Sequence, residues 1–285
     1  MGTARAAPLM RGGERWLLLP AVLVMGALFG GGLIWAAAES LGLATAHTDP
    51  GFDAYRRAIS SPGFLAGLSM SLWIAGASTF LSAGLGLAVA LAVRDALSRP
   101  GPSLLLWLPL PVPHLIAGVL IIVTLGGGGH LARVLDGFTP LSLHGPWALG
   151  AILAYVWKET PFIALFVAGH LQTLPRGLDG TARVLGASPA QTFRRVTWPL
   201  IRPSLLAAAA ITFLFSFGAF EVPFLFGISH PIPLPVLAHQ AYMSTALVDR
   251  PLAMAIDILL ALSSAALALL CLAAWNWSRK KVGAK

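Results

Sequence analysis

The sequence has 285 residues, of which 57% are hydrophobic and only 11% are charged, and its mean hydropathy is +0.79. Soluble domains carry roughly 25% charged residues, so this composition excludes a soluble globular protein and indicates an integral membrane protein. The formal net charge of +8 does not indicate nucleic-acid binding, because that function needs a basic face on a folded soluble domain.

Six apolar runs are long enough to cross a bilayer, which takes about 20 residues in a helix. Lipid cannot satisfy exposed backbone polar groups, so membrane spans are helices or closed barrels, and these long uninterrupted runs favour helices. We therefore predict an all-α polytopic membrane helix bundle with six transmembrane helices. The predicted spans are residues 16–38, 64–93, 103–125, 147–170, 204–228 and 252–275.

The first span has some features of a secretory signal peptide. Arg5, Arg11 and Arg15 precede it, and the sequence WAAAES at its end resembles a cleavage site. Its apolar run is longer than the usual stretch of about 7 to 15 residues in a signal peptide. We therefore predict an uncleaved first span that follows a cytoplasmic tail, residues 1–15, and leads into an outside loop that ends at residue 63.

The second and third spans contain small residues and one histidine. Gly76, Gly84 and Gly86 in the second span fit close helix packing. We predict that His114, in the third span, is a hydrogen-bonded interior residue, because the other histidines show no metal-ligand spacing with it. The GGGG run at 126–129 lacks the strand and helix context of a phosphate-binding loop and is predicted to be a flexible loop.

Four ionisable residues in the last three spans are candidate solute-pathway residues, because charged groups within a membrane usually face the bundle interior or a water-filled cavity. Lys158 and Glu159 are adjacent near the middle of the fourth span. Their side chains point about 100° apart on a helix, so each is expected to pair with another helix or to contact a solute. Glu221 lies near the outer end of the fifth span, just before Pro223, where we expect a helix break. Asp257 lies near the outer start of the sixth span.

The basic residues predict the orientation of the chain. With the N-terminus inside, fourteen Lys and Arg residues are cytoplasmic and four are outside, as the positive-inside rule requires. This places both termini in the cytoplasm, including the basic tail 276–285. The outside residues are Arg56, Arg57, Arg133 and Arg250, and Lys158 lies within a span.

The loop between the fourth and fifth spans, residues 177–203, has the pattern of two short helices. Asp179 suits a helix start, Gly186 supplies a break, and Ser188 followed by Pro189 is a strong signal for a new helix. An apolar face beside basic residues indicates a docking surface, although a helix pair held to anionic lipid by its arginines is an alternative. The predicted apolar face consists of Val184, Leu185, Phe193, Val196 and Trp198.

This loop resembles the cytoplasmic loop of binding-protein-dependent ABC importer permeases with a MetI-like core. The family signature is Glu-Ala-Ala, three residues, Gly, nine residues, Ile, one residue, Leu-Pro. Four positions match it with every spacing kept, namely Ala182, Gly186, Val196 and Pro199.

Three positions depart from the signature, with Gly180 at the Glu position, Thr181 at the first Ala and Trp198 at the Leu. Asp179, one position before Gly180, could supply the missing carboxylate. The resemblance implies a loop that docks on an ATPase subunit, with coupling residues Asp179, Ala182, Gly186, Ala187, Arg194, Arg195, Val196 and Pro199.

The resemblance covers residues 64–275, the expected MetI-like core, and implies an importer in the bacterial inner membrane. Two permease subunits, identical or different, would form the pathway, two ATPase subunits would bind beneath, and a periplasmic or lipid-anchored protein would deliver the solute. No P-loop sequence of the Gly-x4-Gly-Lys-Ser/Thr type occurs here, so a partner ATPase is expected to use ATP and Mg²⁺. No cofactor, metal or catalytic residue is expected in this chain.

Two other classes of function are weighed against the importer. An intramembrane enzyme would need a Ser-His, paired-Asp or metal constellation at one depth, which the sequence does not suggest. A stand-alone secondary transporter or channel fits the ionisable residues of the last three spans. For the solute, the later spans resemble permeases for polyamines, thiamine, ferric iron or oxyanions, and Glu221 with Asp257 mildly favours a cation.

Overall fold

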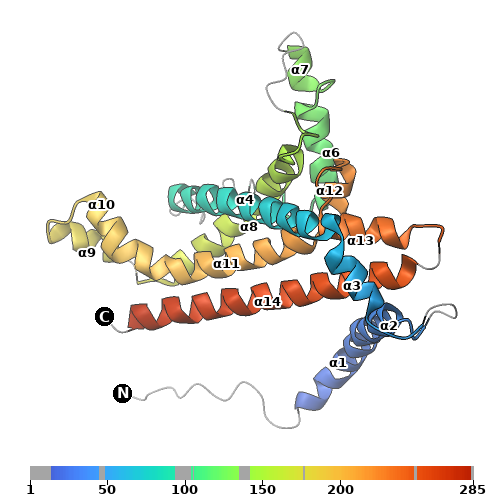
Figure 1. The fold of residues 1–285 in the computed structure, drawn as a ribbon. Coiled ribbons are helices and arrows are strands. Elements are labelled where there is room, and N and C mark those ends of the chain that lie inside the picture. The colour runs from blue at the N-terminus through green and yellow to red at the C-terminus, as the bar shows by residue number, and fades with distance from the viewer. Residues whose placement is uncertain are drawn as a thin grey trace.

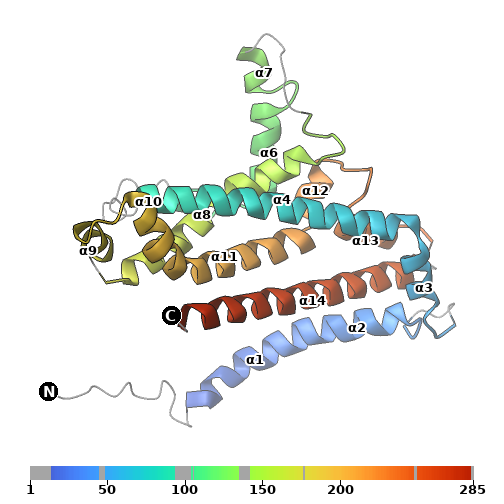
Figure 2. The same ribbon diagram turned by 60° about the vertical axis from the view of Figure 1, so that its left-hand side comes forward.

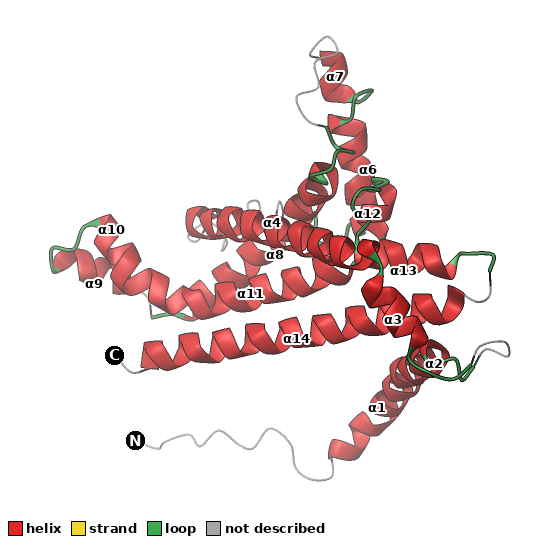
Figure 3. Ribbon diagram, viewed as in Figure 1, coloured by secondary structure: helices red, strands yellow, loops and turns green. Residues whose placement is uncertain are grey.

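The structure is a computed structural model, and it describes residues 14–44, 49–93, 104, 106–134, 142–175, 177–246 and 249–283. Over these ranges the chain forms helices joined by loops and turns, with no strand (Figure 3). Six helical segments are long and apolar enough to cross a membrane. The all-α class and the six predicted spans are therefore confirmed.

The helices follow the predicted order along the chain. They are α1 (Leu19–Met25), α2 (Gly31–Ser40), α3 (Asp53–Ser60), α4 (Pro62–Val93), α6 (His114–Leu125), α7 (His130–Val134), α8 (Leu149–Thr173), α9 (Leu178–Val184), α10 (Pro189–Thr192), α11 (Trp198–Gly218), α12 (Glu221–Leu225), α13 (Leu234–Tyr242) and α14 (Arg250–Gly283). A π-helical turn, Gly26–Gly30, joins α1 to α2, and another, Phe193–Thr197, joins α10 to α11. The first of the membrane-spanning segments, Trp16–Ser40, thus includes both α1 and α2.

The third span begins later than predicted. Residues 104, 106 and 107 are helical, but turns follow them, and the helical segment long enough to span starts at His114 rather than at residue 103. Proline has no backbone N–H and disfavours helical conformation in the residue before it. Pro109, Pro111 and Pro113 therefore leave a series of turns ahead of α6, and Pro113 itself is extended, with ψ 145°. We predicted a continuous span here because the stretch is strongly apolar.

The fifth and sixth spans also differ from their predicted limits. The apolar helical segment assigned to the fifth span runs from Pro189 to Gly218 instead of 204–228, since α10 continues through the π turn into α11. In the sixth, α14 extends to Gly283, so residues 276–283 of the predicted tail are helical.

The core of the bundle lies where α4, α8 and α11 pack together. Buried residues of these three helices, among them Ala90, Ile163 and Leu205, form one continuous apolar cluster. A Cβ added to Gly86 would lie 2.8 Å from Cγ2 of Ile163, so this glycine is required for the close approach of α4 to α8. Gly76 and Gly84 have no such neighbour within 4 Å, so within this single chain the predicted close packing is seen for Gly86.

The 126–129 glycine run forms a turn between α6 and α7, at the place where we predicted a loop. The N–H of Gly129 donates to the carbonyl of Gly126 at 2.8 Å. A Cβ on Gly129 would lie 2.6 Å from the carbonyl oxygen of Val123. Gly126 and Gly129 are therefore packed against the end of α6, whereas Gly127 and Gly128 are exposed and have no neighbour within 4 Å of an added Cβ.

The bundle has two distinct ends (Figures 1 and 2). Helices α9 and α10 lie at one end, together with the last turns of α14. Helices α3 and α13 lie at the opposite end, where the N–H of Leu234 donates to Oγ of Ser71 at 3.0 Å and fixes the start of α13 on α4. The described end of the last helix thus shares a side with the α9–α10 loop.

Candidate functional site

The loop between α8 and α11 contains two short helices, α9 and α10, joined by a turn, as predicted. Gly186 has φ +85°, a conformation that favours glycine. The N–H of Ala187 donates to the carbonyl of Ala182 at 3.0 Å, and the N–H of Gly186 donates to that of Arg183 at 2.9 Å. This pair of bonds is a Schellman motif, which ends a helix with a left-handed residue at the position of Gly186.

The second helix of this loop starts with a capping box. Oγ of Ser188 accepts from the N–H of Gln191 at 3.3 Å, and Oε1 of Gln191 accepts from the N–H of Ser188 at 2.9 Å. Pro189 occupies the first turn, where its missing N–H costs nothing. The predicted restart at Ser188 is confirmed, and the helix then continues without a break into α11.

The predicted apolar face of the loop is divided by the fold. Val184 is 88% exposed and Leu185 is 82% exposed at the tip. Trp198 instead packs against the buried cluster of α4, α8 and α11, because it already belongs to the first turn of α11. Phe193 is 37% exposed, and Val196 is half-buried.

The other predicted coupling residues lie along the same loop. Arg194 and Arg195 are exposed on the π turn and line a surface hollow with Ala190 and Gln191. The backbone of Asp179 lies in the first turn of α9, and Pro199 is in the first turn of α11. The loop therefore presents an apolar tip beside two arginines.

Lys158 and Glu159 do not pair with each other, and each bonds to a segment outside α8. Nζ of Lys158 donates to the carbonyl oxygen of Leu110 at 2.6 Å. Nε2 of His114 donates to Oε1 of Glu159 at 2.8 Å. Both α8 side chains are buried, at 7% and 8% exposed. The expected pairing with another helix is confirmed for Glu159, and so is the interior hydrogen bond of His114. Lys158 instead bonds to the turn ahead of α6.

Tyr155 is a polar residue that the sequence analysis missed. It is fully buried one turn before Glu159, and its hydroxyl has no hydrogen-bond partner in the described part of the chain. The centroid of its ring lies 6.1 Å from that of the His114 ring. Its position in the sequence, one helical turn before the adjacent Lys158 and Glu159, could have identified it as a candidate site residue.

Glu221 begins α12, directly after a break in the fifth span. Helix α11 ends at Gly218, and Pro223 lies inside α12. Pro223 cannot donate to the carbonyl of Ala219, so α11 cannot continue through this point as a regular helix. The expected break is therefore present, but it precedes Glu221 instead of following it.

Asp257 lies on α14 and faces a different environment from Glu221. It lines a hollow of about 360 Å³ with Phe220, His239 and Tyr242, and Glu221 is not among the described residues that line it. The centroid of the His239 ring lies 4.3 Å from that of the Phe220 ring, and His239 lines the same hollow as Asp257. The four candidate pathway residues are thus divided between two places, α8 with α12 and α13 with α14.

The sequence of residues 81–282 matches the family model described as "Binding-protein-dependent transport system inner membrane component". The chain belongs to this family. It is therefore a multi-pass permease subunit of an ATP-driven ABC importer in the inner membrane, and the alternative of a stand-alone transporter is not supported.

Individual relatives agree with this assignment. The molybdenum transport system permease protein ModB of Mycobacterium tuberculosis is 27% identical over 258 residues, which are 88% of this chain and 90% of the relative. The sulfate transport system permease protein CysW of Synechococcus elongatus is 33% identical over 138 residues, 47% of each chain.

Two solved structures share the fold of this permease. A bacterial ABC transporter that imports the acidic polysaccharide alginate matches with a TM-score of 0.75 and 19% identity, over 93% of this chain and 94% of that chain. The MetNI methionine ABC transporter in an inward-facing conformation matches with a TM-score of 0.56 and 23% identity, over 75% and 95%.

Proposed function

We propose that this permease imports an oxyanion. Together with a second permease subunit it forms the pathway, an external binding protein delivers the anion, and a separate ATPase chain uses ATP and Mg²⁺ to drive transport. The single observation that carries the solute class is the similarity to a molybdenum permease over 90% of that protein's length. The shorter similarity to a sulfate permease points to the same chemical class.

We further propose that residues 179–199 dock on the ATPase. The Schellman turn at Gly186 and the capping box at Ser188 make the loop rigid, and its exposed tip offers Val184 and Leu185 beside Arg194 and Arg195. Because α8 leads into the loop and α10 continues into α11, motion of the docked loop would reach both spans.

Docking of this loop would place both termini in the cytoplasm. The end of α14 lies at the same end of the bundle as α9 and α10 (Figures 1 and 2). The chain has an even number of candidate spans, six, so its N-terminus would lie on the same side of the membrane as its C-terminus. The excess of basic residues on this side supports that orientation. A reporter fused to the C-terminus that is active only outside the cell would contradict it.

Uptake by the reconstituted complex tests the solute class. Proteoliposomes would contain the permease with its ATPase and be supplied with its binding protein, and ATP-dependent uptake of molybdate, sulfate and the polyamine putrescine would be compared. We expect uptake of molybdate or sulfate. Uptake of putrescine without either oxyanion would overturn the oxyanion proposal and favour the cationic solute that Glu221 and Asp257 suggested.

We expect Glu221→Gln to make the resting pathway leakier to an oxyanion. A carboxylate at the α11–α12 break would repel an anion, and the substitution removes the charge while preserving size. At the effective dielectric constant of a protein interior, removing this charge should lower the energy barrier to an anion by at least about 1.4 kcal/mol. That corresponds to a roughly tenfold higher leak rate.

The leak is measured as ATP-independent efflux of molybdate from loaded proteoliposomes. Asp257→Asn is the matched control, because Asp257 loses the same charge in the separate hollow by His239. An unchanged efflux rate in a correctly inserted Glu221→Gln protein would remove Glu221 from the pathway.

A further inference from the structure

The segment before α6 carries Pro109, Pro111 and Pro113, which interrupt its backbone hydrogen bonding, so it needs support from outside its own backbone. In a regular helix the carbonyl of Leu110 would accept from the N–H of His114, but the extended Pro113 prevents this. An unpaired carbonyl away from water costs free energy. Lys158 supplies the missing donor at 2.6 Å.

A second contact holds the other side of the prolines. His114 is the first residue of α6, and its Nε2 donates to Oε1 of Glu159 at 2.8 Å. The imidazole ring also lies 4.4 Å from the ring of Phe215 on α11. Two adjacent residues of α8 thus hold the chain at Leu110 and at His114, on either side of Pro111 and Pro113.

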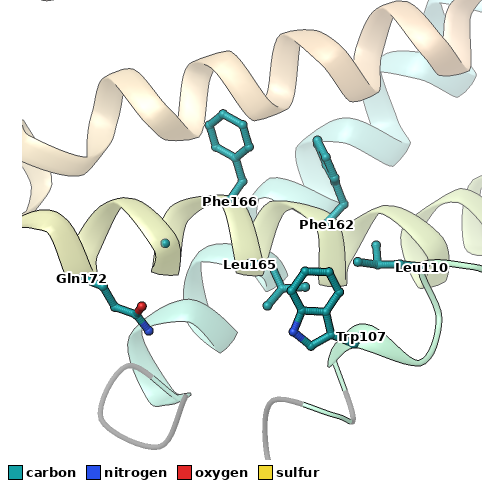
Figure 4. Close-up of a pocket in the computed structure, with 7 residues that line it drawn as sticks. Trp107, Leu110, Phe162, Leu165, Phe166 and Gln172 are labelled. Atoms are coloured by element: carbon teal, nitrogen blue, oxygen red, sulfur yellow. The ribbon is translucent and has the colours of Figure 1, made fainter. Parts of the chain in front are cut away.

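Beyond these contacts the segment stands away from α8. Trp107 and Leu110 face α8 across an apolar hollow of about 500 Å³ (Figure 4). The α8 side of this hollow consists of Phe162, Leu165, Phe166, Gly169 and Gln172. This stretch of α8 continues toward the loop between α8 and α11, which we propose docks on the ATPase. The two polar contacts therefore link the start of α6 to the helix that leads into that loop.

We infer that Lys158 and Glu159 are positioning residues, which anchor the proline-rich start of α6 to α8, and that they do not bind the solute. Both charged groups are buried and already have partners, so a solute would have to displace them. The inference rests on the transport function of the permease and is independent of the solute's identity. If the contacts of Lys158 and Glu159 are lost, the start of α6 should move into the hollow, and its position should no longer depend on that of α8.

Glu159→Gln and Glu159→Ala separate anchoring from solute contact. A Gln side-chain oxygen can still accept from Nε2 of His114, whereas Ala cannot. We expect Glu159→Gln to transport within about twofold of the wild type, and Glu159→Ala to lose about tenfold in maximal rate with an unchanged apparent affinity for the loaded binding protein, as expected for a lost hydrogen bond to a charged group. Lys158→Arg and Lys158→Met form a second pair with the same expected contrast.

Cross-linking reports the position of the segment directly. Cysteines replace Trp107 and Phe166 in a chain whose Cys271 is changed to Ser, and disulfide formation across the hollow is compared with and without Lys158→Met. We expect faster cross-linking when the anchor is lost. Unchanged cross-linking, or a loss of transport by Glu159→Gln as large as that of Glu159→Ala, would overturn the inference. The ATPase should still copurify with all of these variants. A loss of transport caused by a lost anchor is thereby distinguished from a loss caused by failed docking on the ATPase.

Discussion

A permease that carries Gly186→Asp is expected to insert and to associate with its partner permease, but to lose coupled transport by at least about tenfold. The reason is that an L-residue in this left-handed backbone conformation costs about 1 to 2 kcal/mol. Gly186 has φ +85° and no neighbour within 4 Å of an added Cβ, so the cost within this chain is conformational. The new carboxylate would also lie beside the surface that we propose docks on the ATPase. Copurification of the ATPase and solute-stimulated ATP hydrolysis measure the loss.

Gly180→Asp is the matched control for this variant. Gly180 is in the first turn of α9, has no neighbour within 4 Å of an added Cβ, and is exposed. An acidic residue there suits the helix N-terminus and stands at the Glu position of the family signature. We expect this control to keep or improve coupling. If an inserted Gly186→Asp protein retained full coupled transport, Gly186 would have no role in docking, and the lipid-bound helix pair would become the better explanation.

Gly86→Leu is expected to reduce the stability of the permease more than any other substitution proposed above. A Cβ at Gly86 would lie 2.8 Å from Cγ2 of Ile163 and 3.1 Å from the carbonyl oxygen of Thr160. Both atoms belong to α8, so α4 and α8 would have to separate. Overpacking of this kind costs roughly 3 kcal/mol. We expect a lower midpoint of thermal unfolding in detergent and a lower yield of inserted protein, and both can be measured.

Gly84→Leu makes the same change two residues earlier on the same helix. Gly84 has no neighbour within 4 Å of an added Cβ and is exposed, so we expect little change in the unfolding midpoint of the purified single permease. Equal destabilisation by both substitutions would show that helix propensity or lipid contact, rather than the α4–α8 interface, decides the effect. A stable Gly86→Leu protein would contradict the packing described here.

The sequence by itself determined the features that depend on local physics. The six spans follow from the length of apolar runs, and the turn at Gly186 and the helix start at Ser188 follow from residues that favour those conformations within a few positions. The proline break before His114 was also encoded locally, in Pro109, Pro111 and Pro113, but the hydropathy of the stretch hid it.

The tertiary structure alone decided which residues meet. Lys158 and Glu159 find their partners 48 and 45 positions away in the chain, and no local pattern specifies contacts at such a separation. The same holds for Gly86, whose difference from Gly84 depends on which face of α4 meets α8, and for Asp257, whose neighbour His239 lies on another helix. Hydropathy and capping act within a segment, whereas these contacts require the relative placement of helices, which packing of the whole bundle sets.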